Sequence, residues 1–565
     1  MAMARTAPAG SRRCWPQFSK GRVVVVVALA IMPAVTAEEE IKATPTERAV
    51  SVMLLGSIGF QMLLFYLVNW PDRDIQRYSW GVISQTISIF CAVLLFQGFN
   101  GIIEEYIIKG GGPLWEVTVD MAQLVFWLTA MQTVLALTSG ALQELFSDVK
   151  PDMEKVELNV KSWSVLFSHT TGFAAINAWG SLQQNLFAET PFTTLFPIVI
   201  GWFGLILMYS GFDNIREHIA LADDGEKDEY EKMWDEETED AEHDVAGLSL
   251  SFLTVQSIRF YLCGVLPNQE GGEKWEILSQ HKSSEVIALL GSGFGFFLFS
   301  FVPLMIESRF HHQLHSLPHS LQEKLKRVIE ILNNFCTFGN AWCFFFGMKW
   351  FLASVDYIEE DALLNVVLAL LLSFIAFLFI FVLDKALDNH IFGHDEHIAN
   401  TAAEKLIVAL GILIGFSWEQ SFDSAVGVVA VGFEDTCPPL ITKLAMSVLL
   451  VVIVFPAWRL YILKTERGLS DESMEAIVLK MAAGRHHEMF MDREVDEHAL
   501  DLAHLKMKHH RRAFLGTSAT GATEGLRHLQ VTVSGIKVVD STASPASNLN
   551  RRSSGLSELA HSLLA

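Results

Sequence analysis

Long runs of apolar residues, separated by short polar or charged stretches, recur along most of the chain. A helix needs about 20 apolar residues to cross the hydrocarbon core of a bilayer. Applied to this sequence, that length predicts an all-α polytopic integral membrane protein with about eleven transmembrane helices. The predicted segments are 49–70, 80–103, 118–143, 163–187, 194–212, 248–267, 285–306, 329–353, 362–383, 406–430 and 440–463.

The charges between these segments predict their orientation. Lys and Arg gather in alternate connections, for example Arg73 and Arg77 after the first segment and residues 324–327 before the eighth. Because cytoplasmic loops carry an excess of basic residues, the start of the first segment is predicted to be exoplasmic. The weakest segment is 248–267, which is short and contains Arg259. Without it, the second half of the chain would be inverted.

The composition supports a membrane location and narrows the partners. Of the 565 residues, 51% are hydrophobic and 19% are charged, and the mean hydropathy is +0.33. A soluble protein would carry about 25% charged residues. The formal net charge of -23 argues against nucleic-acid binding. The lipid bilayer is therefore the first predicted partner, and no pattern specifies a cofactor.

Residues 1–37 have the features of a signal or targeting peptide. A basic region without acids precedes an apolar run at 23–32, and residues 35–37 offer a small-residue cleavage site. This pattern predicts the secretory route and an endomembrane or plasma-membrane location. An uncleaved signal anchor and an organelle transit peptide are the alternatives, the latter with an organelle membrane as the destination.

Two pairs of segments share features that suggest an internal repeat. Segments four and ten each contain a Gly-Phe step, and segments two and eight each contain a Phe-X-Gly step. The sequence therefore predicts two related five-helix halves, 38–213 and 285–463, joined at 214–284 by an acidic loop plus a connecting helix. The alternative is that apolar segments align passably by chance. The aligned pairs are Phe173 with Phe416, Asn177 with Gln420, and Asn100 with Lys349.

Carboxylates inside an apolar segment are the strongest indication of a site. Segment ten contains Glu419 and Asp423, and a charged residue at the centre of a membrane helix costs about 2.5–3.5 kcal/mol to insert. A spacing of four residues places both on one helical face. We predict that they bind a cation or exchange a proton, because a membrane site must replace the hydration shell that it removes. The alternatives are a structural ion pair and carboxylates that water reaches.

Other polar residues lie mainly in the even-numbered segments, which are predicted to line an interior surrounded by nearly pure apolar segments three, five, nine and eleven. Lys349 is predicted to pair with Glu419, or else to snorkel to the surface. For the amides and for His169, interhelical hydrogen bonding is the alternative role. The candidate binding residues are Glu419, Gln420, Asp423, Lys349, Asn340, Asn177 and His169.

These features together predict a transporter or channel for a small cation or a proton-coupled solute. No catalytic pair stands at a recognisable spacing, so an enzyme is not predicted. The alternative function is a membrane scaffold that binds partners through the acidic residues 223–244 and the cytoplasmic tail, 464–565. The acidic residues are predicted to form a solvated, disordered linker, and the tail to be helical and then disordered. Cytoplasmic partners of the tail and a homo-oligomer are left open.

Overall fold

The computed structural model describes residues 45–142, 152–222, 225, 227–315, 319–355, 358, 361–389, 396–433 and 437–469. Within this part of the chain the regular structure is helical, without strands. The predicted targeting peptide, 1–37, and the tail beyond residue 469 lie outside the described residues. The long helices are α2 (Pro45–Val68), α3 (Arg73–Ile103), α4 (Pro113–Thr138), α5 (Met153–Leu186), α6 (Phe196–Ala220), α7 (Glu229–Cys263), α9 (Ser283–His315), α10 (His319–Ala353), α11 (Asp361–Asp388), α12 (Glu396–Gly432) and α13 (Pro439–Ala457). The short elements are η1 (Glu104–Ile108), η3 (Thr193–Leu195), α8 (Trp275–Leu278) and η4 (Trp458–Leu463).

Every predicted segment overlaps one of the long helices. Nine helices among the described residues are long and apolar enough to cross a membrane, as a multi-spanning membrane protein requires. α5 and α10 are long enough, with 34 and 35 residues, but are too polar to join this set. Their polar side chains are buried against other helices, among them His169 and Asn177 on α5 and Asn333 and Asn334 on α10.

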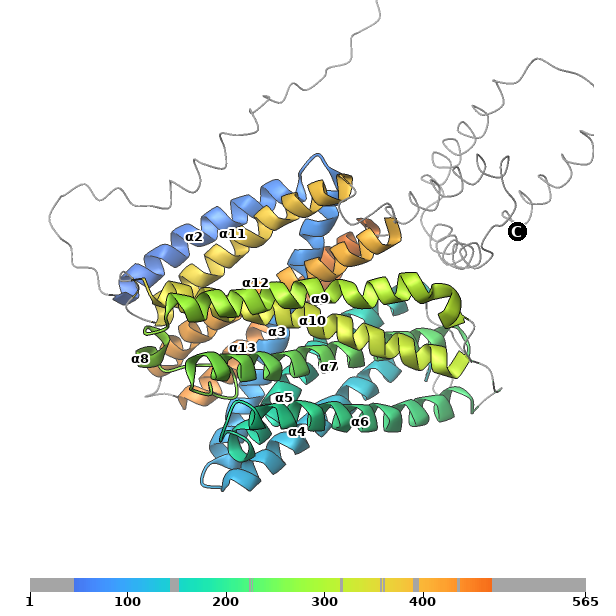
Figure 1. Ribbon diagram of the computed structural model, residues 1–565, viewed down its shortest axis with the longest axis horizontal. Helices are drawn as coiled ribbons and strands as arrows, with labels where there is room; N and C mark the ends of the chain where they lie inside the picture. Colours follow the sequence, from blue (N-terminus) through green and yellow to red (C-terminus); the bar gives the residue numbers. More distant parts are fainter. Residues whose placement is uncertain are drawn as a thin grey trace, which may run out of the picture.

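The helices form an interior group and an outer group. In the most apolar stretch of α7 and of α12, 78% of the residues are buried, against 6% in α2 and 11% in α13. In the bundle, α2 and α11 lie at one edge and α4 and α6 at the other (Figure 1). The exposed side chains of the outer helices are largely Leu, Ile, Val and Phe. Segment ten, α12, is therefore an interior helix as expected, and segment six, α7, which was expected only to connect the two halves, is interior as well.

The acidic stretch at 223–244 is the main correction to the sequence-based picture. From residue 229 onward it is not a disordered linker but the first part of α7. The Asp228 side chain accepts hydrogen bonds from the backbone N–H groups of Tyr230 and Glu231, at 2.8 and 2.9 Å. The Glu231 side chain in turn accepts from the backbone N–H of Asp228, which completes a capping box. This reciprocal cap starts the helix within the acidic run.

A close approach between α7 and α10 leads to a prediction about stability. A Cβ atom at Gly247 would lie 2.8 Å from the Cβ of Asn334 and 3.1 Å from its carbonyl carbon. We expect Gly247→Ala to lower the free energy of unfolding by about 1–3 kcal/mol, because the two helices must separate. Gly211→Ala on α6 is the matched control, since a Cβ there meets no atom within 4 Å. Thermal unfolding of both variants in detergent tests this, and equal midpoints would contradict the tight contact.

Candidate functional site

Glu419 lies on α12 in the interior of the bundle, and its exposed fraction is 0%. Its Oε2 accepts a hydrogen bond from Gln420 Nε2 at 3.1 Å. Its Oε1 is buried and has no hydrogen-bond partner among the described residues. One turn further on, Asp423 forms an ion pair with Lys443 of α13, at 2.6 Å, and both side chains are 35% exposed. One acid of the predicted pair is therefore sealed and incompletely bonded, while the other is paired and reached by solvent.

Two more carboxylates lie around this pair. Glu270, in the loop between α7 and α8, is within electrostatic range of Glu419 and Asp423. It also interacts with Glu104, at the end of α3. Enclosure by the protein and the negative charges of Glu104 and Asp423 raise the pKa of Glu270 to about 7, against the attraction of Lys443. We call this end of the bundle, with its four carboxylates and Lys443, the site end.

Side-chain contacts hold the loop that carries Glu270 in place. Gln269 Nε2 donates to Glu116 of α4. Gln184 of α5 donates to the carbonyl of Pro267 at 2.6 Å, and Gln256 of α7 donates to the carbonyl of Asn268 at 2.9 Å. Three helices thus fix the loop beside the site. No periodic pattern in the sequence marks a loop carboxylate, which is why Glu270 escaped prediction.

A chain of polar contacts also links α3, α4 and α5 at the site end. Asn177 Nδ2 donates to Asp120 Oδ1 at 3.0 Å and to Asn100 Oδ1 at 3.3 Å. Asn100 Nδ2 donates to Glu104 Oε1 at 2.7 Å. Asn177 therefore makes the interhelical bonds that were the alternative to a binding role. The expectation that segment three is a nearly pure apolar segment outside the interior does not hold for Asp120 and Gln123, which are buried there. A carboxylate in an apolar run was the signal that singled out Glu419, and it applied to Asp120 as well.

The other predicted residues do not join Glu419. Lys349 is half-buried on α10 and, within the described structure, forms no ion pair with Glu419, although the two charges interact at longer range. His169 is buried on α5, eight residues before Asn177, and its Nδ1 has no partner among the described residues. Asn340 lines a small cavity with Asn333, Thr337 and Lys405, toward the opposite end of α10 and α12.

An aromatic layer separates the site from that cavity. Phe416, one turn before Glu419 and Gln420, stacks against Phe173 of α5 with ring centroids 6.1 Å apart and an interplanar angle of 8°. Trp342 and Phe345 of α10 meet the same ring edge-on, each at 4.9 Å. All four rings are buried. This packing closes the interior of the bundle directly beneath Glu419.

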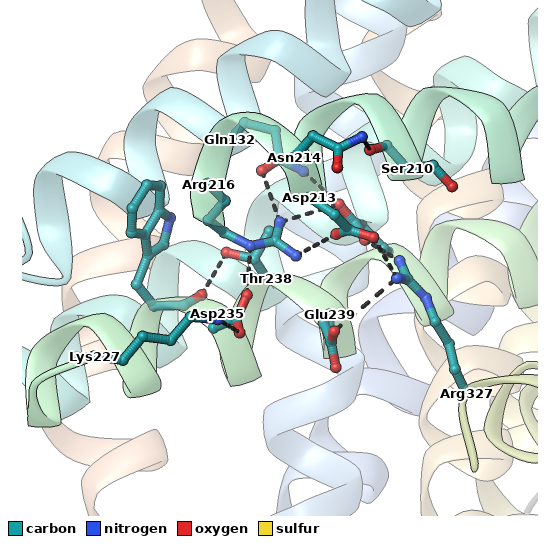
Figure 2. A network of polar contacts seen from close by, with 12 residues as sticks. Gln132, Ser210, Asp213, Asn214, Arg216, Lys227, Asp235, Thr238, Glu239 and Arg327 are labelled. Atoms are coloured by element: carbon teal, nitrogen blue, oxygen red, sulfur yellow. Dashed lines mark hydrogen bonds and ion pairs between the residues drawn. The ribbon is translucent and has the colours of Figure 1, made fainter. Parts of the chain in front are cut away.

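At the opposite end, a network of ion pairs ties α4, α6, α7 and α10 together (Figure 2). Arg216 of α6 contacts Asp235 at 2.7 Å and Glu242 at 3.4 Å, both on α7. Arg327 of α10 pairs with Asp213 at 2.6 Å and with Glu242. Gln132 of α4, Lys227 and Glu239 complete the network. The acids of α7 thus pair within the bundle.

Near the site end, a second buried cluster fixes the loop before α9. Glu273 accepts from Arg259 of α7 at 2.6 Å and from Trp350 of α10 at 2.9 Å. His281 Nε2 lies 2.9 Å from the same carboxylate, and its ring stacks on Trp350. Burial by itself would raise the pKa of Glu273, but Arg259 and His281 lower it to about 2. The predicted segment 248–267 was the weakest because it contains Arg259, and this ion pair neutralises the charge of that residue.

This lowered pKa predicts an acid-dependent loss of stability. The ordinary pKa of the Glu273 carboxyl is 4.5 and its folded value is about 2. The ionised form therefore stabilises the fold above about pH 4.5, and this contribution, at most about 3 kcal/mol, disappears as the pH falls toward 2. Unfolding of wild type and Glu273→Gln, measured in detergent between pH 6 and 3, tests this. The wild-type curve should fall toward that of the variant, whereas Glu276→Gln, at an exposed position, should follow the wild type.

The described part of the chain contains two groups of three potential metal ligands, and within each group the ligand atoms lie within 4.8 Å of one another. Neither group contains Glu419 or Asp423. In the first group, His243 Nδ1 already pairs with Glu330 at 3.1 Å. The first group is Asp240, His243 and Glu330, and the second is Asp72, Asp74 and Asp384.

Comparisons of the chain with protein-family models, with curated proteins and with solved structures find no match. The chemistry of the site therefore rests on its own geometry. That geometry offers buried and half-buried carboxylates at one end of the bundle, amide groups beside them and a closed aromatic layer beneath.

Proposed function

We propose that this chain is a multi-pass membrane transporter or channel for a small cation or a proton-coupled solute, with Glu419 as its central group. The carrying observation is the buried Oε1 of Glu419, which lacks a partner among the described residues. A carboxylate in that position is costly unless it takes up a proton or a cation. Glu270, Glu104 and Asp423 add negative charge that attracts a cation to the same end.

We also propose that all eleven long helices cross the membrane and that they form two related halves. The polar faces of α5 and α10 are covered by other helices, which removes the objection to their spanning a bilayer. The stack of Phe173 on Phe416 supports the repeat, because equivalent residues meet at a pseudo-twofold axis. Both aligned positions also bond to neighbouring helices: the Asn177 side chain donates to Asp120 of α4, and the backbone carbonyl of Gln420 accepts from the Asn365 side chain of α11.

The scaffold function has less support than transport. Its acidic element is mostly helical, and Asp235, Glu239 and Glu242 pair with Arg216 or Arg327 inside the bundle. Ion flux into proteoliposomes distinguishes the two functions. A transporter loses flux in Glu419→Gln and keeps it when the tail after Thr465 is removed. A scaffold shows no flux; it keeps its partner binding in Glu419→Gln and loses that binding when the tail is removed.

A further inference from the structure

Asp120 presents a buried carboxylate that the proposed Glu419 site does not use. It lies on α4 and is 1% exposed. Its Oδ1 accepts from Asn177, as described above, and its Oδ2 is buried without a partner in the described part of the chain. Neither an Arg nor a Lys forms an ion pair with it there. Its negative charge is therefore uncompensated. Glu104 and Glu116 lie within electrostatic range and make the surroundings still more negative.

Two amide side chains without partners lie one turn deeper in the bundle. Gln123 follows Asp120 by three residues on α4, and Gln97 precedes Asn100 by three residues on α3. Residues three apart share a helical face and differ in depth by about 4.5 Å. Because Asp120 and Asn100 both contact Asn177, these two faces converge on α5. Gln123 is 5% exposed, and neither its oxygen nor its nitrogen has a partner among the described residues, nor does the oxygen of Gln97.

Protonation alone does not satisfy these groups. With Oδ1 of Asp120 occupied by the donor Asn177, an added proton would sit on Oδ2, and the Ser181 side chain also interacts with this carboxylate. Ionised, the same oxygen is a buried charge without a counter-ion, which is strongly unfavourable. The two Gln oxygens remain unpaired in either case. A bound cation would satisfy all three oxygens at once.

We propose that Asp120, Gln97 and Gln123 form a second binding site, which takes a monovalent alkali cation. The proposed ligand atoms are all oxygens, which suit hard cations, and they include no imidazole nitrogen or thiol sulfur. One carboxylate with neutral amides balances a single positive charge. Divalent cations usually require several carboxylates, and the described residues bring no group of three carboxylate, His or Cys ligands together here.

The internal repeat gives this site a counterpart. The position aligned with Asn100 in the second half is Lys349, whose ammonium interacts with Glu419 at long range. The second half thus carries a positive charge of its own where the first half has an amide. A cation at Asp120 would restore the same balance in the first half. This comparison rests on the proposed function and its two halves, whereas the unpaired oxygens of the site do not.

Binding of radioactive sodium to the purified full-length protein in detergent, with potassium as competitor, tests the site without requiring transport. We expect saturable binding by the wild type and at least a tenfold weaker affinity in Asp120→Asn. Gln123→Leu is the second variant, since replacing an unpartnered buried amide by an apolar side chain of similar size preserves the fold. It should weaken binding as well.

Two controls should retain wild-type affinity. Glu105→Gln removes an exposed carboxylate of the same region that pairs with Lys109, and Gln61→Leu repeats the amide replacement at an exposed position on α2. Sodium bound at the Glu419 site instead would be lost in Glu419→Gln and kept in Asp120→Asn, which would overturn the proposal. Wild-type affinity in both Asp120→Asn and Gln123→Leu would overturn the proposal, as would binding of neither sodium nor potassium by the wild type. Loss of flux in Glu419→Gln with unchanged sodium binding in Asp120→Asn would leave the proposed function standing and remove the second site alone.

Discussion

Replacing Arg216 by methionine is expected to lower the free energy of unfolding by about 3–5 kcal/mol, as for other buried ion pairs that lose one partner. The Arg216 side chain is 2% exposed and contacts three carboxylates as well as Gln132. Its partner Glu242 is 0% exposed. Without the guanidinium, Glu242 keeps Arg327 and Gln132 as its partners among the described residues, and its remaining charge stays in an environment that water does not reach.

The measurement is thermal or urea unfolding of the purified protein in detergent, together with the yield of folded protein. Arg216→Lys should have an intermediate stability, because an ammonium keeps the charge but cannot make the forked contacts of a guanidinium. Lys155→Met is the control, since its pair with Asp152 is exposed and should be worth less than about 1 kcal/mol. If Arg216→Met costs no more than Lys155→Met, the network in Figure 2 does not hold the helices together.

Glu419→Gln is expected to reduce cation or proton flux at least about tenfold, to the level of protein-free liposomes, because the amide can neither release a proton nor balance a cation. The same substitution should leave the fold intact. Glutamine has the shape of glutamate without its charge, and burial of a charge is the larger cost. The folded variant should therefore unfold at the wild-type temperature or above.

Flux into proteoliposomes is the measurement, with protons and common monovalent and divalent cations as substrates. Glu105→Gln is the matched control, because its carboxylate is exposed and lies outside the cluster around Glu419. Unchanged flux in a well-folded Glu419→Gln protein would reject the site and keep the function. Absence of flux from the wild type across the whole panel would reject the cation-transport proposal.

Much of the fold is written locally in the sequence. An apolar run of about 20 residues specifies a helix wherever it stands, so each predicted segment overlaps an observed helix. The spacing of Glu419 and Asp423 placed them on one face without any knowledge of their neighbours. A local rule also bears on the wrong prediction for the acidic run. Its high charge predicts a disordered linker, whereas the capping box of Asp228 and Glu231 starts a helix there.

Tertiary structure decided which groups meet. Asp423 pairs with Lys443, because the packing of α13 on α12 brings the Lys443 ammonium close to it. The sequence instead predicted an ion pair between Glu419 and Lys349. Glu270 and Glu104 reach the site from a loop and from the end of another helix. The polarity of α5 and α10 reads as a weak membrane signal in sequence, yet other helices cover it in the bundle. Helix formation depends on neighbours along the chain, whereas the pairing of buried charges depends on contacts between distant segments, and the sequence pattern carries only the first.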